Sequence, residues 1–119
     1  MAAKVNLADK LSGFDELWQP RIVAMLNDYK VIVTKVKGEF VWHKHDETDD
    51  FFLVVKGHLT IQLRDENVEL DEGELFVVPR GVEHCPRADE EAWVLLIEPE
   101  QTMNTGDAGG PLTAEPKWA

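Results

Sequence analysis

Short apolar runs, rich in β-branched residues and separated by turn residues, follow one another through the middle of this chain. Runs of this length are typical of β-strands. The expected strands are 21–25, 29–36, 39–43, 51–56, 58–64, 68–70, 74–78, 84–87 and 92–98. The segments between them have turn composition, including 88–91, and none is long enough for an extended helix. The pattern predicts an all-β fold, an antiparallel sandwich or barrel.

The two ends of the chain are less regular. Ser12 begins a capping-box pattern, and Phe14, Leu17 and Trp18 have helical spacing, so a single helical turn that ends before Pro20 is expected. From about residue 101 the chain has loop composition. With 119 residues, the size is that of one domain. We expect a core at about 29–99, an N-terminal segment 1–28 and a loop-like C-terminal tail 100–119.

Three of the four histidines occur in two short segments. His43 and His45 are separated by one residue, so on an extended strand both side chains point to the same face. His84 ends the segment that starts at Gly73. Neutral imidazoles suit Mn, Fe, Co, Ni, Cu and Zn alike, and the pattern indicates a metal site.

The second segment resembles one of the two motifs of the cupin superfamily, G(X)5PXG(X)2H(X)3N. Gly73, Pro79, Gly81 and His84 match it, and Ala88 stands where the family usually has Asn.

The first segment resembles the other motif, G(X)5HXH(X)3-4E(X)6G. His43, His45 and Gly57 match, Gly38 is one residue too close to His43, and Asp50 stands at the glutamate position. The resemblance covers residues 38–88 and implies a double-stranded β-helix, or jelly-roll barrel, that binds a divalent metal inside.

The resemblance implies that His43, His45, Asp50 and His84 bind one divalent transition metal per chain, such as Mn, Fe, Ni or Zn. The side chain of Asp50 is one methylene shorter than glutamate, so either Asp50 is a ligand or a water completes the site. Asp49 and Glu47 are the candidates to replace it. Asp50 is favoured by its spacing, whereas Asp49 is expected to face the other way.

Other residues of interest have simpler expected roles. His58 is expected to be an ordinary strand residue. Cys85 follows His84, so on a strand it faces away from the site and is expected to be a small buried hydrophobe. Phe52, Gln62 and Trp93 are candidates to line the mouth of the barrel.

The net charge of −11 and the pI near 4.6 argue against a nucleic-acid partner, because the twelve basic residues are scattered. The apolar runs are too short to cross a membrane. One cysteine and no apolar leader favour a soluble protein of the reducing cytoplasm. The segment 51–55 is apolar on both faces of its strand, so a second subunit is expected to cover it in a homodimer.

Two classes of function fit these observations. A metal with three histidine ligands and one carboxylate retains open coordination positions, which are typical of catalytic sites. The first class is therefore a metal-dependent enzyme that acts on a small oxygen-rich molecule by Lewis-acid chemistry, as an isomerase, lyase or dioxygenase. The alternative is a non-catalytic module that binds a metal or a small ligand. No general acid or base is evident in the sequence.

Overall fold

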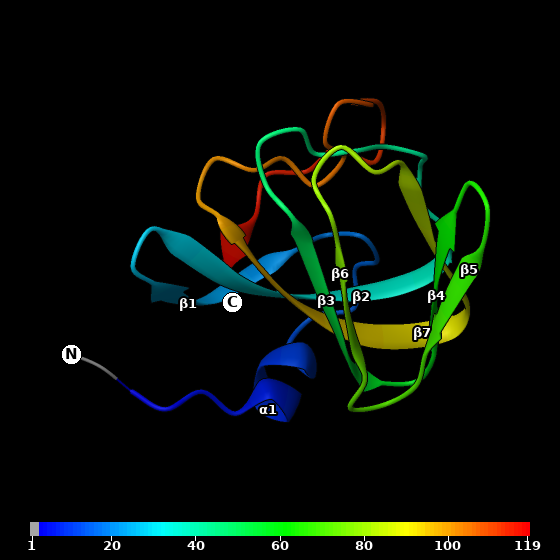
Figure 1. Cartoon of the computed structure of the whole chain (residues 1–119). Helices are drawn as coiled ribbons and strands as arrows, with labels where there is room; N and C mark the ends of the chain where they lie inside the picture. The colour runs from blue at the N-terminus through cyan, green and yellow to red at the C-terminus, as the bar shows by residue number, and fades with distance from the viewer. Residues whose placement is uncertain (1–2) are drawn as a thin grey trace.

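The computed structural model describes residues 3–119, and its regular secondary structure is almost entirely β-strand (Figure 1). One short helix, α1, precedes eight strands. Their bounds are α1 Leu7–Leu11, β1 Arg21–Leu26, β2 Tyr29–Glu39, β3 Asp50–Lys56, β4 Leu59–Leu63, β5 Asn67–Leu70, β6 Leu75–Val78, β7 His84–Pro99 and β8 Lys117–Trp118. The expected all-β fold is confirmed. Within the described residues, no helix could span a membrane.

The barrel is closed by β7, a strand of 16 residues. The first part of β7 pairs with β4, where His84 lies opposite Leu63. The rest of β7 pairs with β2 on one side, from Arg87 to Pro99, and with β3 on the other. One strand therefore takes part in both faces of the barrel, which brings the motif that contains His84 next to the one that precedes β3.

The interior is filled by side chains that alternate along the strands. In β3, Asp50, Phe52 and Val54 are buried. Leu59 and Ile61 of β4 pack in the same cluster as Phe52 and Val54. Because Asp50 shares the inward face with two apolar residues, its carboxylate lies inside the barrel.

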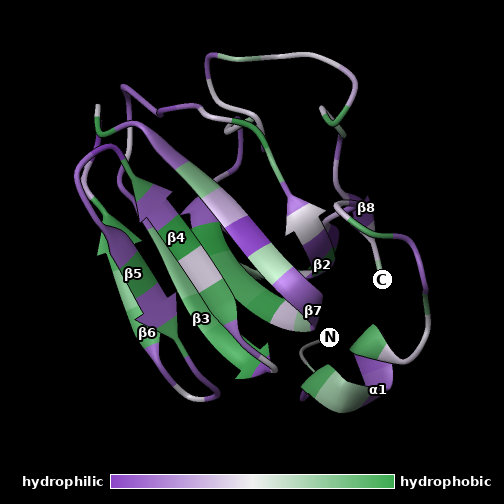
Figure 2. Ribbon diagram, turned by 90° about the vertical axis from the view of Figure 1, so that its right-hand side faces the viewer, coloured by the Kyte–Doolittle hydropathy of each residue, from purple (hydrophilic) through white to green (hydrophobic). Residues whose placement is uncertain are grey.

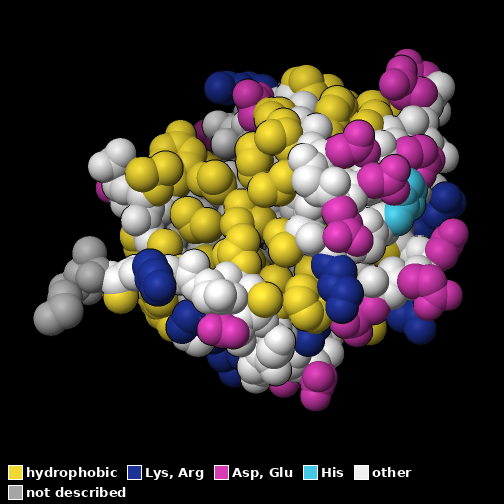
Figure 3. Space-filling view, turned by 90° about the horizontal axis from the view of Figure 1, so that it is seen from below, with side chains coloured by type: hydrophobic (Ala, Val, Ile, Leu, Met, Phe, Trp, Pro, Cys, Tyr) yellow, Lys and Arg dark blue, Asp and Glu magenta, His cyan; other side chains and the backbone are white. Residues whose placement is uncertain are grey.

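A second apolar cluster lies outside the barrel. Leu11 of α1 packs with Phe14, Val33 and Leu95. Partly buried side chains on the outward face of β3 and on β7 adjoin this cluster (Phe51, Leu53, Val55, Trp93 and Ile97). Figure 2 shows the hydrophobic colouring of β3 and β6, and Figure 3 shows apolar side chains gathered into a continuous patch on the side of the molecule where α1 lies.

The N-terminal helical turn is present, but its predicted position was wrong. Helix α1 begins after Asn6, whose side chain accepts a hydrogen bond from the backbone N–H of Asp9 at 3.0 Å. The residues with helical spacing are not helical, because Leu17 bridges to Lys35 of β2 and the Trp18 N–H donates to the Lys35 carbonyl at 2.8 Å. Pairing with β2 overrides the local helical pattern.

Three other boundaries differ from the prediction. The expected strand 39–43 does not form, because β2 ends at Glu39 and His43 takes part in an isolated bridge alone. The expected turn 88–91 lies within β7 as a local irregularity: Ala88 pairs with Gly38 and Ala92 pairs with Val36, and residues 89–91 between them have no partner in β2. The C-terminal tail is loop-like except for β8, which pairs in parallel with β1.

Candidate metal centre

Two segments that are 41 residues apart in the sequence, at His43 and His84, are joined by a pair of backbone hydrogen bonds. The His43 N–H donates to the His84 carbonyl at 3.0 Å, and the His84 N–H donates to the His43 carbonyl at 2.9 Å. The Gly81 N–H donates to the His45 carbonyl at 2.8 Å, which ties the turn before His84 to the same segment. The two motifs are thus held together by the backbone.

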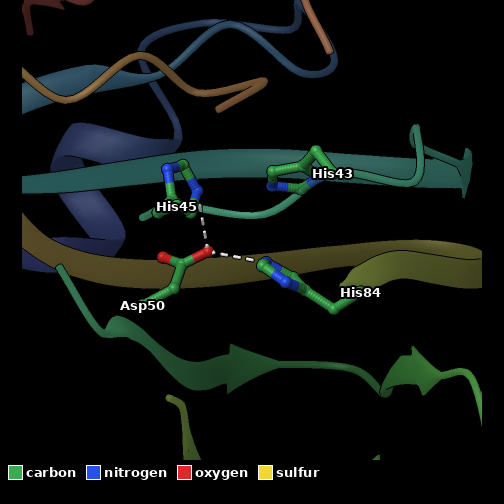
Figure 4. Close-up of side chains that lie close together, drawn as sticks. All are labelled: His43, His45, Asp50 and His84. Atoms are coloured by element: carbon green, nitrogen blue, oxygen red, sulfur yellow. Dashed lines mark hydrogen bonds and ion pairs between the residues drawn. The ribbon is translucent and has the colours of Figure 1, made fainter. Parts of the chain in front are cut away.

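The structure brings together all four predicted ligands: His43, His45, Asp50 and His84 (Figure 4). Each is buried, and one donor atom of each lies within 4.8 Å of the donor atoms of the others. The figure shows His45 and His84 directed at the carboxylate of Asp50, with the ring of His43 close to both other imidazoles. The ring centroid of His43 is 4.3 Å from that of His84 and 5.0 Å from that of His45.

Backbone carbonyl groups orient two of the imidazoles. His43 Nδ1 donates to the Val41 carbonyl at 2.8 Å, and His84 Nδ1 donates to the Val82 carbonyl at 2.9 Å. This leaves Nε2 as the atom of each ring that is free to bind a metal. Histidine ligands of metals usually have such a partner on the other ring nitrogen, because it fixes the tautomer and the ring orientation.

Asp50 is the acidic residue that faces the three histidines. Its Oδ2 accepts a hydrogen bond from His84 Nε2 at 2.9 Å and lies 3.3 Å from His45 Nε2. Asp49, in contrast, is exposed, and its Oδ1 accepts a hydrogen bond from the backbone N–H of Arg80 at 2.9 Å. Asp49 therefore secures the turn before His84 from outside the barrel.

Burial and charge shift the pKa values in this cluster. Burial and the neighbouring His84 lower the pKa of His43 to about 4. Burial also disfavours the charged forms of His45 and Asp50, but their mutual ion pair outweighs it. The pKa of His45 is raised and that of Asp50 is lowered. At neutral pH, His43 is therefore neutral, as a metal ligand must be, and Asp50 is ionised.

The four residues fit a first-row divalent metal. Bonds of about 2.0–2.2 Å to nitrogen and oxygen place opposed donor atoms up to about 4.4 Å apart. The observed limit of 4.8 Å requires movements of a few tenths of an ångström. The hydrogen bond between His84 Nε2 and Asp50 Oδ2 joins two of the four donor groups, and a bound metal would take its place.

An apolar cavity of about 60 Å³ adjoins the cluster inside the barrel. His43, His45 and Asp50 line one part of its wall. Its lining also includes Trp18, Pro20, Ile32, Thr34, Val36, Phe40, Phe52, Leu59, Pro86, Val94, Leu96, Glu98 and Asn104. Of the candidates for the barrel mouth, Phe52 does line this cavity.

The other two candidates for the barrel mouth lie elsewhere. Trp93 packs in the outer cluster, because β7 turns Val94 inward. Gln62 donates to Glu39 at 3.1 Å and to the Cys85 carbonyl at 3.3 Å, and it is not part of the cavity lining.

His58 and Cys85 lie outside the cluster of candidate ligands. His58 is exposed and contacts Glu69 at 2.8 Å and Asp71 at 2.7 Å. Cys85 is fully buried, as predicted, and burial raises the pKa of its thiol to about 11.

Glu98 was not among the predicted site residues, although the sequence contains a signal for it. An acidic residue that ends an apolar run and has the same strand parity as Val94 and Leu96 is expected to face the interior. Asn104 and Trp18 reach the cavity from irregular segments, and no periodicity in the sequence indicated this.

Comparisons with known proteins agree with this architecture. The family model for the cupin domain matches residues 30–99. The crystal structure of a cupin-2 domain protein from Shewanella frigidimarina is 49% identical, has a TM-score of 0.79, and covers 80% of this chain and 93% of its own. The Bacillus subtilis protein YdbB is 30% identical over 80 residues, which are 66% of this chain and 71% of YdbB.

A similarity to dioxygenases also appears. The 3-hydroxyanthranilate 3,4-dioxygenase of Paraburkholderia phytofirmans is 34% identical over 93 residues, which are 71% of this chain. The chain spans about half the length of that enzyme, 48%. The match of the cupin model to more than half of the chain, together with the jelly-roll arrangement of the strands, shows that this protein belongs to the cupin family.

Proposed function

We propose that this protein is a metal-dependent enzyme of the dioxygenase type that acts on a small molecule held beside the metal. The observation that carries the proposal is the position of His43, His45 and Asp50, which face an apolar cavity next to His84. A buried cluster of donor atoms with adjoining space for a ligand is the arrangement of a catalytic metal site, whereas a structural metal site is closed.

The four clustered residues are the proposed metal ligands, one divalent ion per chain. A metal bound there would supply Lewis-acid activation of a ligand oxygen or, as Fe(II), dioxygen chemistry. The likeness to 3-hydroxyanthranilate 3,4-dioxygenases supports dioxygenase chemistry over isomerase or lyase chemistry. The chain's own residues would bind the substrate, exclude bulk water through the apolar lining and keep His43 neutral.

The test is oxygen uptake. Protein purified anaerobically and loaded with Fe(II) is mixed with aromatic diols and aminophenols, including 3-hydroxyanthranilate, while dissolved oxygen is recorded. One equivalent of oxygen consumed per substrate turned over supports the proposal, and His84→Ala should abolish it. Turnover without oxygen uptake would identify an isomerase or lyase and refute the dioxygenase proposal.

A binding module is the second candidate, and the C-terminal tail favours it. Gly106 lies against the Lys44 carbonyl and the ring of His43, and Asp107 Oδ1 accepts a hydrogen bond from the Lys44 N–H at 2.9 Å. The tail therefore lies against the segment that carries His43 and His45, and Thr102 and Met103 line a pocket together with His45. A stoichiometric ligand that is released unchanged from metal-loaded protein would establish this candidate.

We also propose a single cupin domain over residues 1–119, a cytoplasmic location and a homodimer. The lone buried cysteine supports a reducing compartment. The dimer is supported by the outward face of β3 and β6, where Leu53 lies opposite Leu75 and Phe51 lies opposite Val77. Leu75 is 55% exposed and Val77 is 40% exposed. A second copy of the same face would bury these side chains.

A further inference from the structure

Glu98 is a buried carboxyl group that the proposed chemistry does not use. It is the last inward-facing residue of β7 after Val94 and Leu96, and all three line the cavity beside the metal cluster. Its exposed fraction is 3%. A carboxyl group this far from water costs free energy unless charged or hydrogen-bonding groups compensate for it.

The protein's own groups compensate only partly for the burial of the Glu98 carboxylate. Lys30 is the cross-strand neighbour of Glu98, and among the described residues it is the one charged group in ion-pair contact with it. Their Nζ and Oε1 atoms are 3.5 Å apart, which is long for a charged hydrogen bond. Lys30 Nζ donates at 2.9 Å to the Thr102 carbonyl instead. Glu98 therefore retains hydrogen-bonding capacity at the cavity wall.

The rest of the cavity restricts what could use that capacity. Its lining is mainly apolar and includes the aromatic rings of Trp18, Phe40 and Phe52. One water molecule needs roughly 10–15 Å³ of cavity volume. The cavity volume of about 60 Å³ therefore has room for a compact molecule about the size of one ring. Asp50 and Glu98 both line the cavity, and their carboxylates disfavour an anionic ligand because like charges repel.

We propose that Glu98 forms a hydroxyl-binding subsite of the cavity, for an uncharged ring compound whose apolar body fills the space between Glu98 and the metal cluster. This inference rests on the proposed function, because both place the ligand in the same cavity. It narrows the substrate class to compounds with polar groups at two ends of an apolar ring. One polar end would lie toward His43 and Asp50, and the other would lie toward Glu98.

The electrostatics of the subsite agree with this geometry. Burial raises the pKa of Glu98 to about 7, the charge of Asp50 raises it further, and Lys30 and His45 oppose the rise. Near neutral pH both forms of the carboxyl group are therefore present, so it can accept a hydrogen bond from a hydroxyl group or donate one.

The experiment measures binding of phenol and toluene to the metal-free protein by calorimetry. The two probes have nearly the same shape and differ in the hydroxyl group. The test variant is the double substitution Lys30→Met with Glu98→Leu, because exchange of a buried ion pair for apolar residues of similar volume tends to preserve the fold. Glu98→Gln is the second variant, and Glu100→Gln, at an exposed neighbour, is the control.

Wild type and Glu100→Gln should bind phenol more tightly than toluene. In the double variant, phenol binding should weaken by about ten- to hundredfold while toluene binding is retained, because a hydrogen bond to a charged group is lost. Glu98→Gln should keep part of the preference, since its amide oxygen still accepts a hydrogen bond. The same phenol preference in the double variant, or no binding of either probe to wild type, would overturn the inference.

A Co(II) titration of the same proteins separates this inference from the proposed function. All of them should bind one equivalent, because Glu98 is not among the four clustered ligands. Loss of Co(II) binding in wild type with an intact phenol preference would refute the metal site and leave the subsite standing. Full Co(II) binding, together with phenol binding that does not depend on Glu98, would refute the subsite and leave the metal site standing.

Discussion

Replacement of Asp50 by alanine should weaken metal binding much more than replacement of its neighbour Asp49. Asp50 is buried, and its Oδ2 lies within 3.3 Å of both His45 and His84. Asp49 is exposed and bonds the Arg80 N–H outside the barrel. The two carboxylates are adjacent in the sequence but lie on opposite faces of the chain, so Asp49→Ala is a matched control for Asp50→Ala.

The magnitude follows from the number of ligands. Four-ligand zinc sites bind with about 10–16 kcal/mol, so one ligand contributes on the order of 3 kcal/mol, or about two orders of magnitude in Kd. Part of this is offset, because the metal-free wild type must break the hydrogen bond between His84 and Asp50 before the metal binds. We therefore expect a loss of about ten- to hundredfold for Asp50→Ala.

The assay is competition for Zn(II) or Co(II) with a chromophoric chelator at pH 7.5, with metal content checked by elemental analysis. Asp50→Glu restores the usual residue of the motif and should bind within a few-fold of wild type. If Asp49→Ala lost as much affinity as Asp50→Ala, or if Asp50→Ala bound normally, a carboxylate of Asp50 could not be a ligand and the proposed ligand set would be wrong.

Three further predictions concern stability, assembly and the thiol. The unfolding free energy of Glu98→Gln minus that of wild type should rise by about 3 kcal/mol between pH 4.5 and about pH 7. Urea denaturation of the metal-free proteins measures this difference. The sign follows because a folded pKa above the unfolded value gives stability that is lost as pH rises; a pH-independent difference would contradict it. Leu75→Asp should convert a dimer into a monomer in sedimentation experiments, whereas Met103→Asp, on the tail, should not; a monomeric wild type at micromolar concentration would refute the dimer. Cys85→Ser should keep full metal content and activity, since the thiol is buried with its pKa raised to about 11, and loss of turnover with metal retained would point to thiol chemistry.

The sequence alone determined the fold class and the set of candidate ligands. Short β-branched runs can bury a core only as strands, and a spacing of two on an extended chain puts His43 and His45 on one face. The spacing from His45 to Asp50 also selected the carboxylate that the structure places in the cluster, in preference to Asp49. These are local properties, because they depend on strand periodicity and motif spacing.

Tertiary structure decided what local patterns could not. Phe14, Leu17 and Trp18 have helical spacing, but the backbone of Leu17 and Trp18 pairs with Lys35 of β2, and the helix lies earlier in the chain at Leu7–Leu11. The segment 88–91 has turn composition, yet Ala88 pairs with Gly38 and Ala92 pairs with Val36, so the pairing on either side of residues 89–91 keeps β7 continuous. In each case hydrogen bonds to a distant strand outweigh a weak local preference.

The cavity and its second carboxyl group were likewise a result of the tertiary fold. Glu98 lies beside Lys30 because β2 and β7 pair in one register. It lines the same cavity as Asp50 because β3 and β7 turn alternate residues into the same barrel. Sequence spacing carries no information about which strands become neighbours across a barrel. Closure of the barrel around β7 placed Glu98 beside a histidine cluster that lies far away in the sequence.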